Sequence, residues 1–224
     1  MSRLRIAIAE DHLMFREVIR KVCIDEFRHE VVAEADTGPS AVRVVLASSP
    51  DVLLLDLNLP ELDGFGVLEV LRKAHSPVRV IALTSARGEY TLYRVERAGF
   101  HGFVDKSTNN LASLRGAIEA VCTGKTYFAP TFVEANAARK QNPISFDKVL
   151  SERERTVLGL IGRSLSDDEI ARRLKINSRT AETYRQRLMD KLNVHGTPKL
   201  ILFAVEHGFT QVPLQGEEGE AAFP

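Results

Sequence analysis

Chemically reactive side chains stand at or just after the ends of four short apolar runs in the first half of the chain. These residues are Glu10, Asp11, Asp56, Thr84 and Lys106. Neighbouring carboxylates in an apolar setting repel one another, and a divalent cation relieves that repulsion. Mg²⁺ prefers oxygen ligands and commonly takes one or two carboxylates together with phosphate oxygens. With an ammonium group to neutralise charge and a hydroxyl to donate a hydrogen bond, the set suits phosphoryl transfer onto a carboxylate.

The hydrophobic pattern predicts a scaffold that would bring these side chains together. Strand-like apolar runs alternate with helical spacing over the first 125 residues, and the five predicted strands are Leu4–Ala9, Val31–Ala35, Val52–Leu57, Val78–Leu83 and Gly102–Val104. Strands that alternate with helices predict a doubly wound α/β domain with a five-stranded parallel sheet. The carboxyl ends of such strands meet at one edge of the sheet, so the reactive residues are expected to form one site.

From Leu150 onward the pattern becomes purely helical. Four short helices are predicted, and they begin at Ser151, Ser166, Ser178 and Thr197. The first two open with capping boxes, in which the serine is followed three residues later by a glutamate. The second and third are joined by a tight turn at residues 175–177, which is the helix-turn-helix arrangement. The sequence therefore predicts a small all-α helix-turn-helix domain after the α/β domain.

The net charge is zero, but the charges are unevenly distributed along the chain. Residues 1–145 contain 18 basic and 18 acidic side chains, whereas residues 146–211 contain 12 and 9. Residues 212–224 contain three acids and no base. A mildly basic helical domain could meet a polyanion, because Lys and Arg suit phosphates and Gln and Thr suit base edges. Charge and periodicity alone fit a helical protein–protein module equally well.

Composition indicates an ordinary globular protein. Apolar residues make up 44% of the chain and charged residues 27%, which excludes wholesale disorder. No apolar run approaches the roughly 20 residues of a membrane span, and the N-terminus lacks the apolar stretch of a secretory signal. The two cysteines, Cys23 and Cys122, fall in helical apolar patterns, which is typical of a reducing compartment. We therefore expect a cytoplasmic protein without a membrane association.

Residues 4–125 resemble the receiver domain of two-component response regulators, which has a flavodoxin-like fold. The resemblance rests on the acidic pair Glu10–Asp11, on Asp56 followed by LNLPELDG, on Thr84 within LTSA and on Lys106 at the end of GFVDK. It implies that Asp56 accepts a phosphoryl group from a sensor histidine kinase or a small phosphodonor.

The same resemblance implies roles for the surrounding residues. Mg²⁺ would be bound by Glu10, Asp11, Asp56 and the backbone carbonyl of Asn58. Thr84 and Lys106 would bind the phosphoryl oxygens, and Phe103 would fill the space that Thr84 vacates when it moves toward the phosphoryl group. The chain departs from the commoner family pattern in having Glu–Asp for Asp–Asp and Phe for Tyr. The six histidines show no metal-ligand spacing, and His12 is expected to be exposed or to orient the acids rather than to bind metal.

Residues 150–209 resemble the LuxR-type DNA-binding domain. The similar segment reads LSERERTVLGLIGRSLSDDEIARRLKINSRTAETYRQRLMDKLNV and is followed by a last helix ending at HGF. With a receiver in front, the whole chain is similar to the NarL/FixJ family of transcription regulators. The resemblance makes Ser178–Leu192 the recognition helix and Pro198–Glu206 the usual dimer contact.

The recognition helix carries the implied DNA contacts. They are Arg179, Thr180, Glu182, Thr183, Arg185, Gln186, Arg187 and Lys191. Glu182, Thr183 and Gln186 would face bases, while the others are better placed for phosphates. All of these except Thr180 and Lys191 are also outward residues of the helix by periodicity.

These inferences combine into one predicted organisation: a receiver at 1–125, a linker at 126–149, a DNA-binding domain at 150–211 and an acidic disordered tail at 212–224. The predicted protein is a transcription regulator rather than an enzyme, and it binds double-stranded operator DNA, as a homodimer on phosphorylation. An unphosphorylated receiver that masks the recognition helix is one predicted form of control. The first alternative is a regulator that ignores phosphate and responds to partner binding at the receiver. The second, a flavodoxin-like enzyme, leaves the DNA-binding domain unexplained.

Overall fold

The computed structural model describes residues 3–85, 88–108 and 111–210 and divides the chain into two compact units. The first unit comprises residues 1–85 and 95–133, and the second comprises residues 86–94 and 134–224. Each unit has a hydrophobic core of its own. The predicted disordered tail, residues 212–224, lies outside the described residues.

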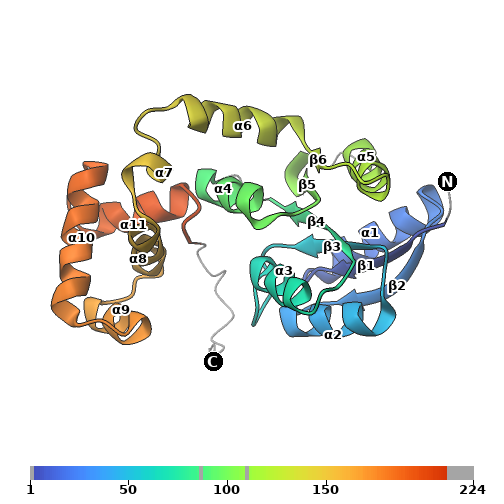
Figure 1. Ribbon diagram of the computed structural model, residues 1–224, viewed down its shortest axis with the longest axis horizontal. Helices are drawn as coiled ribbons and strands as arrows, with labels where there is room; N and C mark the ends of the chain where they lie inside the picture. The colour runs from blue at the N-terminus through green and yellow to red at the C-terminus, as the bar shows by residue number, and fades with distance from the viewer. Residues whose placement is uncertain (1–2, 86–87, 109–110, 211–224) are drawn as a thin grey trace. The chain divides into compact units, whose positions relative to one another are not determined.

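A parallel sheet forms the centre of the first unit (Figure 1). Its strands are β1 (Arg5–Ala9), β2 (Glu30–Ala35), β3 (Val52–Asp56), β4 (Arg79–Thr84), β5 (Gly102–Asp105) and β6 (Tyr127–Phe128). Their order is β2-β1-β3-β4-β5-β6, and every neighbouring pair is parallel. The direction of strand order reverses between β1 and β3, which is where open α/β sheets bind their ligands.

The prediction of five strands is wrong by one, because β6 adds a short sixth strand at the edge of the sheet. Tyr127 of β6 pairs with Gly102, and Phe128 pairs with Phe103. A two-residue strand is too short to show alternation in the sequence, so the hydrophobic pattern gave no indication of it. The five predicted strands and the parallel α/β architecture are confirmed.

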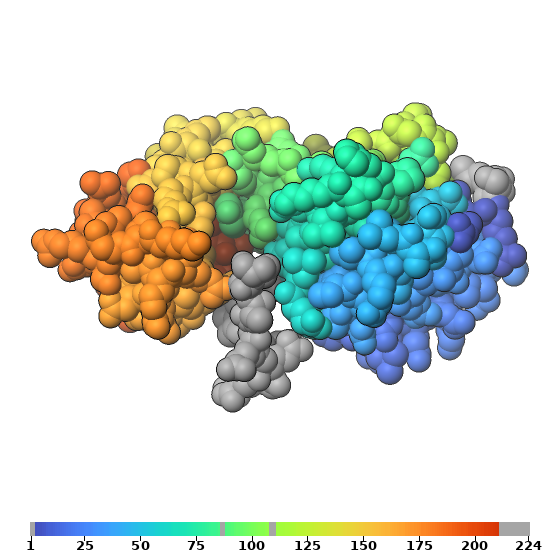
Figure 2. All heavy atoms as spheres, turned by 60° about the horizontal axis from the view of Figure 1, so that its bottom comes forward, coloured from blue at the N-terminus to red at the C-terminus, as the bar shows by residue number. Residues whose placement is uncertain are grey.

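Helices cover both faces of this sheet. They are α1 (Leu13–Lys21), which continues as a π-helical turn (Val22–Glu26), α2 (Gly38–Ser48), α3 (Gly64–Lys73) and α5 (Leu111–Cys122). Helix α4 (Glu89–Ala98) is divided between the units, because its first six residues belong to the second unit. One core cluster joins Ile8 of β1 to Ile19 of α1 and Ile118 of α5. Helices α2 and α3 contact each other and form a continuous surface (Figure 2). All five residues of β3 are buried, as expected for a strand covered on both faces.

The second unit contains the helices that follow the sheet. They are α6 (Pro130–Gln141), of which the first four residues belong to the first unit, α7 (Phe146–Val149), α8 (Glu152–Gly162), α9 (Asp167–Leu174), α10 (Ser178–Leu192) and α11 (Thr197–Glu206). Both predicted capping boxes are present. The backbone N–H of Ser151 donates to Glu154 at 2.8 Å, and that of Ser166 donates to Glu169 at 2.7 Å. The four predicted helices of the C-terminal region are therefore confirmed as α8 to α11.

The turn between α9 and α10 has the local geometry of a helix-turn-helix. Lys175 ends α9 in the left-handed conformation, with φ of 53°. Asn177 caps α10, because its Oδ1 accepts a hydrogen bond from the backbone N–H of Thr180 at 2.7 Å. Ile170 of α9 and Ala181 of α10 are fully buried, and α9 packs directly on α10. Among the described residues, no helix has the length and apolar character needed to cross a membrane.

Candidate functional site

Two buried carboxylates lie where the strand order reverses. Asp56 is the last residue of β3 and is 2% exposed, and Glu10 directly follows β1 and is fully buried. The two strands pair in parallel with Ala9 opposite Leu55. Glu10 and Asp56 therefore leave the sheet at the same level, as the sequence predicted.

Four side chains form a compact group at this edge. The potential ligand atoms of Glu10, Asp11, His12 and Asp56 all lie within 4.8 Å of one another. Nδ1 of His12 is 2.8 Å from Oδ1 of Asp11 and 3.2 Å from Oε1 of Glu10. His12 thus contacts the acids, which is compatible with the orienting role expected for it and also places an imidazole nitrogen among the carboxylates.

Lys106 bridges the two buried carboxylates. Its Nζ lies 2.5 Å from Oε2 of Glu10 and 2.6 Å from Oδ2 of Asp56, and its side chain is only 13% exposed. An ammonium group in this position offsets part of the negative charge that burial would otherwise disfavour. The sequence places Lys106 directly after the predicted fifth strand. In the structure its ammonium group reaches the side chain of Asp56 at the end of β3.

The site remains rich in negative charge despite this bridge. Burial raises the pKa of Glu10, and the charge of Asp56 raises it further, against the opposing effect of Lys106. The pKa of His12 is raised by the charge of Asp11 and by hydrogen bonds to the acids. Closely spaced carboxylate oxygens that repel one another are the donor set that a hard divalent cation prefers. The residues present therefore fit a magnesium ion.

The other predicted residues of this site lie on the adjoining strands and loops. The backbone N–H of Asn58 donates to Oδ1 of Asp56 at 3.1 Å, so the backbone of Asn58 adjoins the Asp56 carboxylate. Thr84 is fully buried at the end of β4, one residue beyond the pairing of Leu83 with Asp56. Phe103 of β5 is 2% exposed, and its ring centroid is 5.0 Å from that of Phe132.

Two further residues support the site and were not predicted from the sequence. A Cβ atom at Gly64 would lie 2.6 Å from the carbonyl oxygen of Asp56, so α3 approaches the end of β3 too closely for any side chain. The guanidinium of Arg16 donates to the carbonyl oxygen of Glu10 and thereby fixes the loop that carries the acidic pair. The Gly64 position was visible in the LNLPELDG segment, whereas no local pattern indicates the reach of Arg16.

A second candidate surface lies on α10. Six of the eight residues expected to contact DNA are exposed on it: Arg179, Glu182, Thr183, Gln186, Arg187 and Lys191. Thr180 is half-buried, and its hydroxyl donates to the capping side chain of Asn177 at 2.8 Å. The exposed set combines cations with Gln and Thr, which is the chemistry needed to contact phosphates and base edges.

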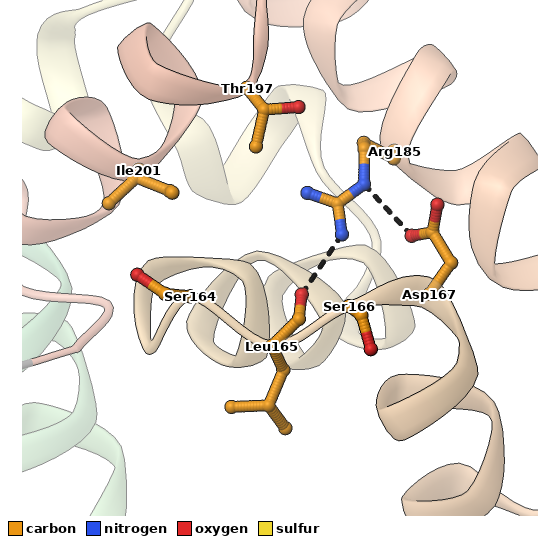
Figure 3. Close-up of a pocket in the computed structure, with 7 residues that line it drawn as sticks. All are labelled: Ser164, Leu165, Ser166, Asp167, Arg185, Thr197 and Ile201. Carbon is orange, nitrogen blue, oxygen red and sulfur yellow. Dashed lines mark hydrogen bonds and ion pairs between the residues drawn. The ribbon is translucent and has the colours of Figure 1, made fainter.

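The prediction that Arg185 points outward is wrong. Its side chain is 12% exposed and turns back onto the start of α9, where Nε donates to Asp167 at 2.8 Å. A second guanidinium nitrogen donates to the carbonyl oxygen of Leu165 at 3.1 Å (Figure 3). These bonds border a pocket of about 360 Å³ between α9, α10 and α11. Helical periodicity could not show whether Arg185 contacts phosphate or bonds to Asp167 and Leu165. An arginine near the edge of the exposed helix face can do either.

Lys191 also has protein partners. Its Nζ lies 2.9 Å from Glu154 and 3.2 Å from the carbonyl oxygen of Val149. Burial alone would raise the pKa of Glu154, but the hydrogen bonds from Lys191 and Ser151 outweigh it and leave that pKa lowered. Lys191 remains 41% exposed, so this pair ties α10 to α8 at the protein surface.

Comparisons with known proteins agree with both parts of this geometry. The family model of the response regulator receiver domain matches residues 6–119, and that of the luxR family of bacterial regulatory proteins matches residues 148–204. BvgA of Bordetella pertussis is 33% identical over 202 residues, which cover 88% of this chain and 94% of that protein. The response regulator GacA of Pseudomonas viridiflava is 29% identical over 209 residues, covering 92% and 97%.

Solved structures show the same likeness. The response regulator ChrA of a heme-sensing two-component system is 26% identical, covers 93% of this chain and 100% of that chain, and has a TM-score of 0.55. RcsB of Salmonella enterica shares the fold with a TM-score of 0.65 at 23% identity, over 92% of this chain and 100% of that chain. The chain belongs to the NarL/FixJ family of response regulators, in which a receiver domain is joined to a LuxR-type DNA-binding domain.

Proposed function

We propose that Asp56 is the phosphoacceptor of this response regulator and that a sensor histidine kinase is its phosphodonor. The observation that carries this proposal is the contact of Lys106 with both Asp56 and Glu10 at the reversal point of the sheet. A buried carboxylate with a bound ammonium beside it combines a nucleophile with a partner for the incoming negative charge. A purely structural salt bridge would not require the two further ligand groups, Asp11 and His12, at the same edge.

The chemical step is the transfer of a phosphoryl group from a phosphohistidine. An oxygen of Asp56 forms the new O–P bond while the P–N bond breaks, and the bonding electron pair returns to the imidazole nitrogen of the kinase. Lys106 and Thr84 then contact the phosphoryl oxygens. Glu10, Asp11, Asp56 and the carbonyl of Asn58 would hold Mg²⁺, which when bound supplies positive charge to offset that of the phosphoryl group.

Phosphorylation would change the packing near β4 and β5. An acyl phosphate adds roughly −1.5 to −2 units of charge, by analogy with other phosphorylated side chains. Thr84, at the end of the strand beside β3, moves toward this charge and leaves space that Phe103 can enter. A local electrostatic event is thereby converted into a rearrangement of the α4–β5 region.

In this proposal the second unit contains the DNA-binding domain. We assign a receiver to residues 1–125, a linker to 126–149 and a DNA-binding domain to 150–211, with double-stranded operator DNA in contact with α10. The residues that support this assignment are exposed on α10: Arg179, Glu182, Thr183, Gln186, Arg187 and Lys191. α11 would join two copies into a homodimer on phosphorylation. As a DNA-binding regulator the protein would act in the cytoplasm, where its operators lie.

Phosphodonor titration tests this proposal. Purified protein is incubated with acetyl phosphate, with and without Mg²⁺, and the phosphorylated fraction is separated on a phosphate-affinity gel. We expect Mg²⁺-dependent labelling of the native chain and none of Asp56→Asn. Genomic fragments selected with and without acetyl phosphate then report DNA binding. A chain that takes no label yet binds the same fragments under both conditions would instead be a regulator controlled by partner binding.

A further inference from the structure

Lys106 occupies the first position of a tight turn that follows β5. The strand ends at Asp105, and a single 3₁₀ turn follows over Lys106–Thr108. From this turn the ammonium of Lys106 reaches Asp56 at 2.6 Å and Glu10 at 2.5 Å. The place of the ammonium in the site therefore depends on the path of the backbone through the turn.

The side chain of Asp105 closes this turn. Its Oδ1 accepts a hydrogen bond from the backbone N–H of Ser107 at 2.9 Å and another from the Ser107 hydroxyl at 2.5 Å. An aspartate that accepts the N–H of the second residue after it forms an Asx turn. The ring closed by this bond includes the backbone of Lys106. Because both bonds go to the same oxygen, an oxygen acceptor at position 105 is the feature that the turn requires.

Asp105 is buried, although its partner Ser107 is exposed. Asp105 is 4% exposed and pairs in register with Thr84, the fully buried last residue of β4. Burial of a carboxylate costs free energy unless the group is hydrogen-bonded. An exposed side chain could close a surface turn without this cost. The burial of Asp105 therefore anchors the turn to the sheet beside Thr84.

The long side chain of Lys106 is flexible, so its ammonium needs support from more than one direction. Its Nζ lies 5.0 Å from the centroid of the Phe15 ring in α1, which is a cation–π contact. The carboxylates of Glu10 and Asp56 contact the same nitrogen. These three groups restrain the end of the side chain, whereas Asp105 restrains the backbone from which the side chain starts.

We propose that Asp105 is a positioning residue for phosphoryl transfer to Asp56. Its Oδ1 holds the turn through Ser107, and the turn places the Lys106 ammonium where it can contact Asp56 and the incoming phosphoryl group. This inference rests on the proposed function, in which Lys106 binds the phosphoryl oxygens. Preorganised charge acts only from the correct position, and a displacement of about 1 Å can slow a reaction on the order of a hundredfold.

Three substitutions separate the acceptor oxygen of Asp105 from its charge. Asp105→Asn keeps an oxygen acceptor and removes the charge, whereas Asp105→Ala removes both. Asp25→Ala, at an exposed position, is the control. With acetyl phosphate and Mg²⁺, we expect the initial rate of labelling to fall about tenfold in Asp105→Ala and to stay within about twofold of the native rate in the other two variants. A native rate in Asp105→Ala, or an equal loss in Asp105→Asn, would overturn the proposal.

The Lys106 ammonium gives a readout that does not depend on phosphorylation. NMR detects the slowly exchanging ammonium protons of a buried lysine, and the signal of Lys106 is assigned by its loss in Lys106→Met. We expect these protons to exchange with water about tenfold faster in Asp105→Ala and at the native rate in Asp105→Asn. A variant that is less stable but keeps Lys106 in place would show no such change. Native exchange in Asp105→Ala would therefore contradict the positioning role.

Failure of the proposed function would give a different pattern. A native chain that takes no label from acetyl phosphate would refute phosphorylation of Asp56, and the exchange of the ammonium protons would still decide whether Asp105 places Lys106.

If Asp105→Ala does not fold, Ser107→Ala takes its place, because it removes the hydroxyl bond and keeps the backbone N–H. The loss of one hydrogen bond should then slow labelling about threefold, and an unchanged rate would count against the proposal.

Discussion

The ammonium nitrogen of Lys106 lies 2.6 Å from Oδ2 of Asp56, in a site where Asp56 is 2% exposed. The same nitrogen is 2.5 Å from Glu10, so one cation serves two buried carboxylates. An incoming phosphoryl group would need the same cation. In the phosphorylation that we propose for Asp56, this cation would stabilise the site before the transfer and contact the phosphoryl group after it.

Removal of this ammonium should impair phosphorylation. In Lys106→Met the developing charge on the phosphoryl oxygens loses one preorganised partner, and we expect the initial rate with acetyl phosphate and Mg²⁺ to fall about a hundredfold. The phosphorylated fraction is followed by intact-mass measurement. Lys125→Met, at an exposed position, is the control and should keep the native rate. A Lys106→Met rate within twofold of the native one would remove Lys106 from the mechanism.

Gly64→Ala should destabilise the backbone at the end of β3, which carries Asp56. The new Cβ would lie 2.6 Å from the Asp56 carbonyl oxygen and 2.9 Å from the Cα of Leu57, both of which belong to a buried backbone. Overpacking of this kind typically costs about 1–3 kcal/mol of unfolding free energy. Urea denaturation measures the loss, with Gly116→Ala as the comparison. Equal stability of the two variants would contradict the close approach of α3 to β3.

Arg185 and Arg187 should behave differently although they are two residues apart. Arg185→Met loses the bonds to Asp167 and Leu165, and we expect about 1–2 kcal/mol less unfolding free energy. Arg187→Met should leave stability unchanged and reduce the salt dependence of DNA binding by about one unit of slope, because an exposed phosphate contact is lost. The unfolding free energy and the salt dependence of DNA binding are measured for both variants. Equal losses of unfolding free energy in the two variants would show that the bonds of Arg185 to Asp167 and Leu165 do not stabilise the fold.

The lowered pKa of Glu154 predicts an acid-sensitive contribution to stability. The unfolded chain binds a proton near pH 4.5, the ordinary value, whereas the folded chain binds it only at lower pH. Stability from this group is therefore present above pH 4.5 and is lost as the pH falls through the folded pKa. Unfolding free energy measured between pH 6 and pH 3 should decline less steeply in Glu154→Gln than in the native chain. Parallel curves would contradict the role of the bonds from Lys191 and Ser151.

The reactive residues at the strand ends could be predicted because each of them lies next in sequence to the apolar run that forms its strand. Apolar runs fix the strands, and parallel strands must deliver the residues that follow them to one edge of the sheet. Glu10, Asp56 and Lys106 therefore met in the structure as their positions in the sequence required. The capping boxes at Ser151 and Ser166 were predictable for a similar reason, since each depends on residues three apart.

Contacts between distant segments could not be predicted in this way. The turn of Arg185 toward Asp167 depends on how α9 crosses α10, which periodicity does not specify. The approach of Gly88 to Gly208 joins residues 120 positions apart and left no local pattern. β6 was too short to produce a signal at all. The sequence thus indicated which residues meet at the strand ends, but not contacts such as that of Arg185 with Asp167, which depend on how helices cross.

Identification of the phosphorylated residue tests the central claim most directly. The chain is phosphorylated with acetyl phosphate and Mg²⁺, the acyl phosphate is reduced with borohydride, and the peptides are sequenced by mass spectrometry. We predict homoserine at position 56 in the native chain and at no position in Asp56→Asn. Homoserine at another aspartate, or a native chain that carries none after labelling, would contradict the assignment of Asp56 as the phosphoacceptor.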